Sequence, residues 1–166
     1  MRTSSPPPRA NFFDASALVK VFGKEPDGEE LRDYWNSRSP TKYTTPFCFY
    51  EAMGVLKGKW LARKELTQDE YFDATFRLFA WYNAATRYAN DVDLQEPTVF
   101  FKVQDLAARH SLDLSDALQI LSVKEGYFSA LANESRTILV TADRRLANAA
   151  RTEGLRVWYC LGDPEP

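Results

Sequence analysis

The chain has 166 residues, of which 45% are apolar and 27% are charged. This length predicts one compact domain with a single core and excludes a second full domain. The 21 basic and 23 acidic residues leave a net charge of −2, which excludes a protein that binds nucleic acid through a general positive field.

The expected single domain covers residues 10–160. Residues 1–9 include three consecutive prolines and two serines, a composition that cannot bury apolar surface and therefore predicts a flexible leader. Residues 161–166 are expected to form a C-terminal tail. No apolar run reaches the roughly 18 residues of a membrane span, and the polar start differs from a secretory signal, so we expect a soluble, cytoplasmic protein.

The first elements follow one another closely. The segment from Asn11 to Phe22 predicts a strand that ends at Asp14 and runs into a helix, because its later apolar residues recur at helical spacing. A helix over Glu29 to Ser37 and a short strand at about Lys42 to Thr45 are expected next. Thr45-Pro46 then predicts a helix start, since threonine caps free amides and proline at the first position loses no hydrogen bond.

The middle of the chain predicts mainly helices. Thr67 to Tyr88 begins with a capping-box pattern and predicts a long helix rich in aromatic residues. Val92 to Leu94 predicts a minimal strand, and Thr98 to His110 predicts a helix. Another helix is expected to open near Asp116.

The last part of the chain returns to strands. Thr137 to Thr141 is a β-branched run between polar residues, typical of a buried central strand. A helix over Ala147 to Glu153 and an edge strand over Leu155 to Tyr159 are expected to follow. Strands that alternate with helices predict an α/β fold with a parallel sheet covered on both faces.

Four acidic residues stand out in this predicted fold. Asp14 and Asp143 follow two strands, and the carboxyl ends of parallel strands meet at one edge, where ligands bind. Glu51 and Asp116 lie in largely apolar helical segments, where burial of an unpaired carboxylate would cost several kcal/mol. A divalent cation would turn repulsion between such acids into binding. Alternatively, Asp14 and Asp116 cap helices, and Asp143 is a turn residue with Arg144 as an ion partner.

The small numbers of histidines and cysteines exclude several other kinds of catalytic and metal site. The lone histidine, His110, cannot supply the two-histidine pair of metal-independent ribonucleases or the HExxH site of a zinc protease. Cys48 and Cys160 are too far apart for CxxC-type zinc spacing and are expected to be buried thiols. Catalysis must therefore come mainly from carboxylates.

Four segments resemble, in order, the acidic signature blocks of PIN domains, and particularly those of VapC-like toxin ribonucleases of toxin–antitoxin pairs. They are FFDASALVK (Phe12 to Lys20), FYEAMGVL (Phe49 to Leu56), LSDALQI (Leu114 to Ile120) and LVTADRRLANAA (Leu139 to Ala150). The resemblance spans about Asn11 to Tyr159. It implies a Rossmann-like sheet of five parallel strands in the order 3-2-1-4-5.

The resemblance also implies a metal-dependent endoribonuclease with an acidic cluster around Mg²⁺ or Mn²⁺. The acids of this cluster would be Asp14, Glu51, Asp116 and Asp143. Ser16 and Thr141 match the small hydroxyl residues beside the first and last acids. Asp113 has no secure counterpart, and we interpret it as a helix cap or a peripheral acid. The implied partners are RNA, a second copy in a homodimer, and a VapB-like antitoxin protein.

Two features of the sequence each allow more than one interpretation. Lys20, Arg144 and Arg145 lie near the predicted sheet edge and are candidate contacts for RNA phosphates, or solvated surface charges. The aromatic-rich helical arm over residues 57–88 exceeds what the nuclease core needs, and it could belong to the core, a dimer surface or an antitoxin groove.

Three alternative functions share part of this sequence pattern. A haloacid-dehalogenase-like phosphatase needs an acid two positions after the first aspartate, where this chain has Ser16. A housekeeping RNA-processing PIN nuclease would use the same site without an antitoxin. A PIN scaffold would bind RNA or a partner without cleaving it, although degenerate members usually lose acids that are all present here.

Overall fold

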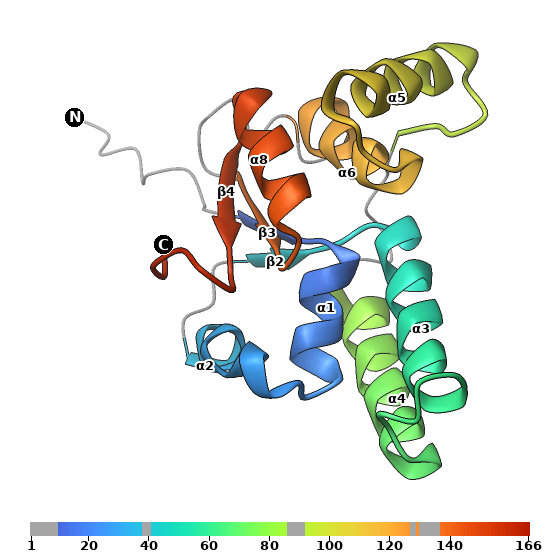
Figure 1. Ribbon diagram of the computed structural model, residues 1–166, viewed down its shortest axis with the longest axis vertical. Helices are drawn as coiled ribbons and strands as arrows, with labels where there is room; N and C mark the ends of the chain where they lie inside the picture. The colour runs from blue at the N-terminus through green and yellow to red at the C-terminus, as the bar shows by residue number, and fades with distance from the viewer. Residues whose placement is uncertain (1–9, 38–40, 86–91, 127–128, 130–136) are drawn as a thin grey trace.

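Figure 1 shows the computed structural model of the chain, which describes residues 10–37, 41–85, 92–126, 129 and 137–166. The expected leader over residues 1–9 lies outside the described residues. Across the described ranges, none of the helices has both the length and the apolar character that crossing a membrane requires.

The centre of the fold is a parallel sheet with the strand order β2-β1-β3-β4. Its strands are β1 (Ala10–Phe13), β2 (Thr41–Tyr43), β3 (Thr137–Thr141) and β4 (Arg156–Tyr159). Every residue of β1 and β3 is buried, because helices cover both faces of the central strands. β2 and β4 are edge strands and each exposes its first residue. The predicted α/β fold with a parallel sheet is confirmed.

The prediction of five strands in the order 3-2-1-4-5 is wrong for the described residues, which form four strands in a different order. The expected strand from Val92 to Leu94 is instead a turn before the next helix. Asp93 Oδ1 accepts a hydrogen bond from Gln95 N at 2.9 Å, and Asp93 O accepts one from Glu96 N at 3.1 Å. This Asx turn commits the backbone to a reversal, so the segment cannot extend along the sheet.

One group of helices lies on one side of the sheet, where α1 contacts β1 and β3 (Figure 1). These helices are α1 (Ala15–Phe22), α2 (Glu29–Ser37), α3 (Pro46–Leu61) and α4 (Gln68–Ala85), with a single 3₁₀ turn at Pro26–Gly28 before α2. α3 begins as predicted, because Thr45 Oγ1 accepts a hydrogen bond from Cys48 N at 3.2 Å. α4 begins with the predicted capping box, in which Thr67 and Glu70 each bond the other's backbone N–H.

A second group of helices lies on the other side of the sheet (Figure 1). These helices are α5 (Pro97–His110), α6 (Leu114–Glu125) and α8 (Arg144–Thr152), and α8 begins three residues earlier than predicted. From the centre of the sheet the chain proceeds in opposite directions, from β1 to β2 and from β3 to β4. Right-handed crossovers in opposite directions place their helices on opposite faces. The crevice between the ends of β1 and β3 is therefore the topological switch point of the sheet.

The aromatic arm divides between the core and the surface. Trp81 of α4 packs edge-on against Trp35 at 4.9 Å, and Trp35 packs in the same way against Phe13 at 4.8 Å. Other aromatic side chains of α4 face away from the core and are more than half exposed. They are Phe72 (53%), Phe76 (71%) and Phe79 (52%). The arm is thus partly core, and it leaves an apolar stripe on one face of α4.

Candidate functional site

Asp14 is the residue at which β1 becomes α1. Its backbone N–H donates to Val140 O at 3.2 Å, which extends the β1–β3 pairing by one residue. Its Oδ1 accepts a hydrogen bond from Ala17 N at 2.8 Å and caps α1. The expectation that Asp14 caps a helix is confirmed, and the same geometry places its carboxylate at the switch point of the sheet.

Two hydroxyl groups hold the carboxylate of Asp14. Ser16 Oγ lies 2.8 and 2.9 Å from its two oxygens, and Thr141 Oγ1 donates to Oδ2 at 2.6 Å. Ser16 Oγ also accepts from Ala142 N at 2.9 Å, and Thr141 Oγ1 accepts from Asp143 N at 3.0 Å. These bonds join the ends of β1 and β3. The two hydroxyl residues therefore fix the orientation of the first acid and the path of the chain to the last one.

The protonation of Asp14 is shifted by its surroundings. The residue is only 2% exposed, and burial raises its pKa from the ordinary 3.8 to about 7. Hydrogen bonds from Thr141, Ala17 and Ser16 oppose this rise, while the charge of Asp116 adds to it. Burial therefore favours the protonated form of this carboxyl when no cation is bound.

Glu51 and Asp116 come from helices on opposite sides of the sheet. Asp116 lies in the first turn of α6, where burial and then the charges of Asp143, Glu51 and Asp113 raise its pKa to about 6. Burial also raises the pKa of Glu51, which lies on α3 and accepts a hydrogen bond from Gln119 Nε2 at 3.1 Å. The carboxylates are thus close enough to repel one another, which favours either protonation or a bound cation.

All four predicted acids line one cavity of about 520 Å³. Ser16 lines it as well, whereas Thr141 is buried directly behind Asp14. A larger cavity, of about 670 Å³, lies beside it but is lined by none of the four acids. We therefore take the smaller, acidic cavity as the candidate site.

Two aspartates differ from their expected local roles. Asp143 Oδ1 accepts from Arg145 N at 2.7 Å and Leu146 N at 3.1 Å and so caps α8, while Arg144 lies over the Tyr159 ring at 5.4 Å. Asp113 occupies the N-cap position of α6, but its side chain makes no capping hydrogen bond. It lines the cavity instead, so the capping interpretation is wrong and the peripheral-acid interpretation holds.

The three basic residues near the site differ in orientation. Arg144 and Lys20 line the acidic cavity. Arg145 donates to the backbone carbonyl of Ser111 and is not among the lining residues. Lys20 forms ion pairs with Glu25 and Asp27.

The donor set suits a hard divalent cation. Its members are carboxylates, and hard cations such as Mg²⁺ take oxygen ligands while keeping several waters. Gln119 Oε1, beside Glu51, is buried and has no hydrogen-bond partner among the described residues. Across the part of the chain that the structure describes, no group of three or more Asp, Glu, His or Cys side chains is placed so that it could hold a metal ion. The fit to a cation therefore rests on the oxygen chemistry of the residues that line the cavity.

The histidine and the two cysteines, which the sequence analysis excluded from catalysis, do not line the acidic cavity. His110 Nε2 lies 2.6 Å from Glu153 Oε1, away from the acidic cavity. Cys48 and Cys160 are both buried, as predicted.

Sequence reasoning missed several lining residues. Ser115 and Gln119 flank Asp116 on α6, and a polar Gln119 within the apolar run LDLSDALQIL, one turn after Asp116, was a signal that could have found it. Glu25 and Lys59 carried no such signal. Both reach the cavity only because α3 packs against α1, a contact between distant parts of the chain.

One comparison with known proteins finds a matching family. The family model of the PIN domain matches residues 12–152, a range from β1 to the end of α8 that includes all four acids. No curated protein matches the sequence.

Proposed function

Because the chain belongs to the PIN domain family, whose members are generally nucleases, we propose that it is a metal-dependent endoribonuclease. The observation that carries this proposal is the convergence of four carboxylates on one cavity at the switch point of the sheet. This position is where parallel α/β sheets bind their ligands. The proposed substrate is RNA, and the proposed domain covers residues 10–160.

Asp14 and Asp116 are the proposed direct ligands of Mg²⁺ or Mn²⁺, with Glu51 and Asp143 acting through water. When bound, the cation would lower the pKa of the attacking water and stabilise charge on the leaving 3′ oxygen. Hydrolysis of this type leaves 5′-phosphate and 3′-hydroxyl ends.

The remaining residues of the cavity act by positioning. Ser16 and Thr141 hold the Asp14 carboxylate in one orientation, and Gln119 holds Glu51 through its amide N–H. Arg144 is an exposed residue that lines the cavity, and a guanidinium suits a phosphate oxygen of the substrate. Such positioning costs no reorganisation when the substrate binds.

We further propose that the protein is a VapC-like toxin that acts in the cytoplasm as a homodimer and is neutralised by an antitoxin protein. The support for a protein partner is the exposed stripe of Phe72, Phe76 and Phe79 on α4. Contiguous apolar patches on a protein surface commonly mark protein contacts.

The test is cleavage of a mixed RNA pool by the purified protein with Mg²⁺ or Mn²⁺. We expect cuts that bear 5′-phosphates and that disappear with EDTA and in Asp14→Asn. The matched control is Asp33→Asn, which removes an exposed carboxylate of α2 outside the cavity and should cleave normally. Cleavage that survives both EDTA and Asp14→Asn would contradict the proposal. Absence of cleavage by a protein that still binds RNA would favour the scaffold alternative.

A further inference from the structure

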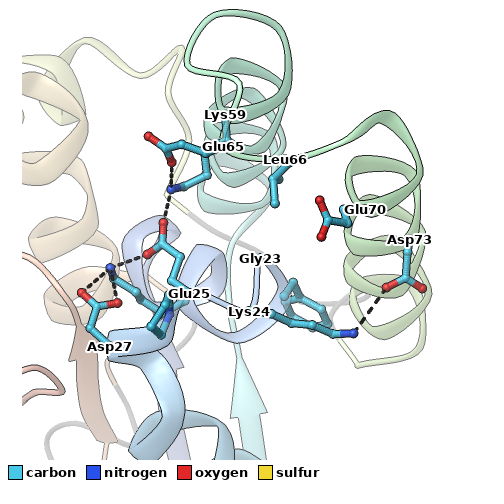
Figure 2. Close-up of a pocket in the computed structure, with 12 residues that line it drawn as sticks. Gly23, Lys24, Glu25, Asp27, Lys59, Glu65, Leu66, Glu70 and Asp73 are labelled. Carbon is cyan, nitrogen blue, oxygen red and sulfur yellow. Dashed lines mark hydrogen bonds and ion pairs between the residues drawn. The ribbon is translucent and has the colours of Figure 1, made fainter.

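The acidic cavity and the larger cavity beside it share three lining residues, Lys20, Glu25 and Lys59. Figure 2 shows the larger cavity, with Glu25 and Lys59 pointing toward each other from two different segments. Lys20 lies in the last turn of α1 and Lys59 in the last turn of α3. These side chains therefore form the boundary between the two cavities.

Glu25 bridges the two lysines with one oxygen for each. Its Oε2 pairs with the Lys20 ammonium and its Oε1 with the Lys59 ammonium. Asp27 pairs with Lys20 at 2.8 Å and Glu65 with Lys59 at 2.5 Å, so a row of alternating charges runs along the boundary (Figure 2). The bridge is largely shielded, since the exposed side-chain fractions are 17% for Lys20, 17% for Glu25 and 12% for Lys59.

This arrangement has the form of an anion site. A carboxylate that gives one oxygen to each of two ammonium groups presents the same charge and contacts as the two free oxygens of a phosphodiester. Besides Glu25, the neighbouring acidic cavity is lined by five acids, namely Asp14, Glu51, Asp113, Asp116 and Asp143. An RNA strand that enters this cavity needs cationic contacts beside it, and the two lysines supply two at one point.

We infer that Lys20 and Lys59 together bind one backbone phosphate of the substrate RNA, and that the Glu25 carboxylate occupies this phosphate site in the free protein. This inference rests on the proposed function, because it assigns a subsite to the same substrate. Lys20 lies six positions after Asp14, about 9 Å along the axis of α1. The bound phosphate therefore belongs to the same strand as the bond at the acids and lies close to it.

The site holds one phosphate and does not extend into the larger cavity. The walls of that cavity carry four further acids, which repel a polyanion. They are Asp27, Glu65, Glu70 and Asp73. The strand must therefore leave the boundary toward solvent, and Glu25 must swing away from the lysines when the phosphate arrives.

The test begins with binding of a fluorescein-labelled single-stranded RNA of mixed sequence, measured by fluorescence anisotropy in EDTA, where no cleavage is expected. Lys20→Ala and Lys59→Ala should each weaken binding about five- to tenfold through loss of a charged contact. The variant with both substitutions should also reduce the slope of log K against log salt by about 0.7, the value for one phosphate of a single strand. Glu25→Gln should strengthen binding several-fold, because it removes the competing anion and keeps the side chain's shape.

Lys57→Ala is the matched control, since Lys57 is an exposed lysine of the same helix that lines neither cavity. With Mn²⁺ present, the Lys59→Ala variant should raise KM and leave kcat nearly unchanged, because a backbone contact binds ground state and transition state alike. Lys59→Arg keeps the charge and should restore most of the binding. Melting temperatures of all variants identify any loss that comes from unfolding.

The gain in Glu25→Gln is the decisive outcome, because a structural role of the ion pairs cannot produce it. If Glu25→Gln weakens binding as the lysine variants do, or if Lys57→Ala weakens it equally, the inference is overturned while the nuclease proposal stands. If the wild-type protein neither binds nor cleaves RNA, the proposed function is overturned and the inference falls with it.

Discussion

The buried carboxylate of Asp14 should make the metal-free protein lose stability as the pH rises. The unfolded chain titrates this group at 3.8, whereas burial raises its pKa to about 7 in the folded protein. Between these values the folded state binds more protons than the unfolded state, so deprotonation favours unfolding. At 1.36 kcal/mol per pH unit, the full difference corresponds to about 4 kcal/mol above pH 7.

The comparison between pH 5 and pH 8 isolates most of this effect. Applying the two titrations to both pH values gives a loss of about 3 kcal/mol from Asp14 alone. The assay is urea unfolding in EDTA, followed through the fluorescence of the four tryptophans. Asp14→Asn lacks the titrating group and should show a pH dependence smaller by that amount. It should also be more stable than the wild type at pH 8.

Addition of Mg²⁺ at pH 8 should reverse the loss in the wild type, because a cation that binds only the folded site stabilises it by mass action. Asp14→Asn should gain much less from Mg²⁺. Equal pH dependence of the two proteins in EDTA would refute the reasoning, since it would mean that the Asp14 carboxyl is solvated as well in the fold as in the unfolded chain.

Three further predictions test other parts of the molecule. The hydrogen bond from Lys124 holds the pKa of Glu153 at about 2, so Glu153→Gln should cost about 2 kcal/mol at pH 7 by urea unfolding. This difference from the wild type should shrink as the pH falls from 4.5 through about 2, and a difference that stays constant would exclude the ion pair as its cause. Thr141→Val removes the 2.6 Å hydrogen bond to Asp14 and should lower stability by about 1 to 3 kcal/mol. It should also raise the Mn²⁺ concentration needed for half-maximal cleavage, whereas an unchanged metal requirement would exclude a positioning role. Phe76→Glu adds a charge to a side chain that is 71% exposed, so the fold should persist. If the proposed homodimer forms through this stripe, light scattering should report a change from dimer to monomer; a dimer mass that survives in the variant would place the interface away from α4.

The parts of the fold that sequence predicted correctly depend on local signals. The Thr45-Pro46 helix start and the Thr67 capping box each need only a few adjacent residues, and both bonds are present. The buried strand β3 follows from its β-branched composition. The alignment of Asp14 with Asp143 at one sheet edge follows from strand direction alone.

The predictions that were wrong, and the contact that sequence reasoning missed, have physical reasons. The three-residue pattern of Val92 to Leu94 is too short to outweigh the side-chain bond of Asp93, which turns the chain. Asp113 stands at the cap position, but its carboxylate faces the cavity, a choice between two orientations that spacing does not encode. The approach of Lys59 to Lys20 depends on the packing of α3 against α1, which no local pattern reports.

The bonds that join β1 to β3 connect residues 125 to 127 positions apart in the chain. A ribosome releases Asp14 127 residues before Thr141, and domains generally fold as units once enough chain has emerged. Until β3 docks, β1 lacks a neighbour on one edge and the first acid lacks its hydroxyl partners. An emerging chain therefore holds its acids apart, and the acidic cavity assembles only after the segment that carries Thr141 and Asp143 has left the ribosome.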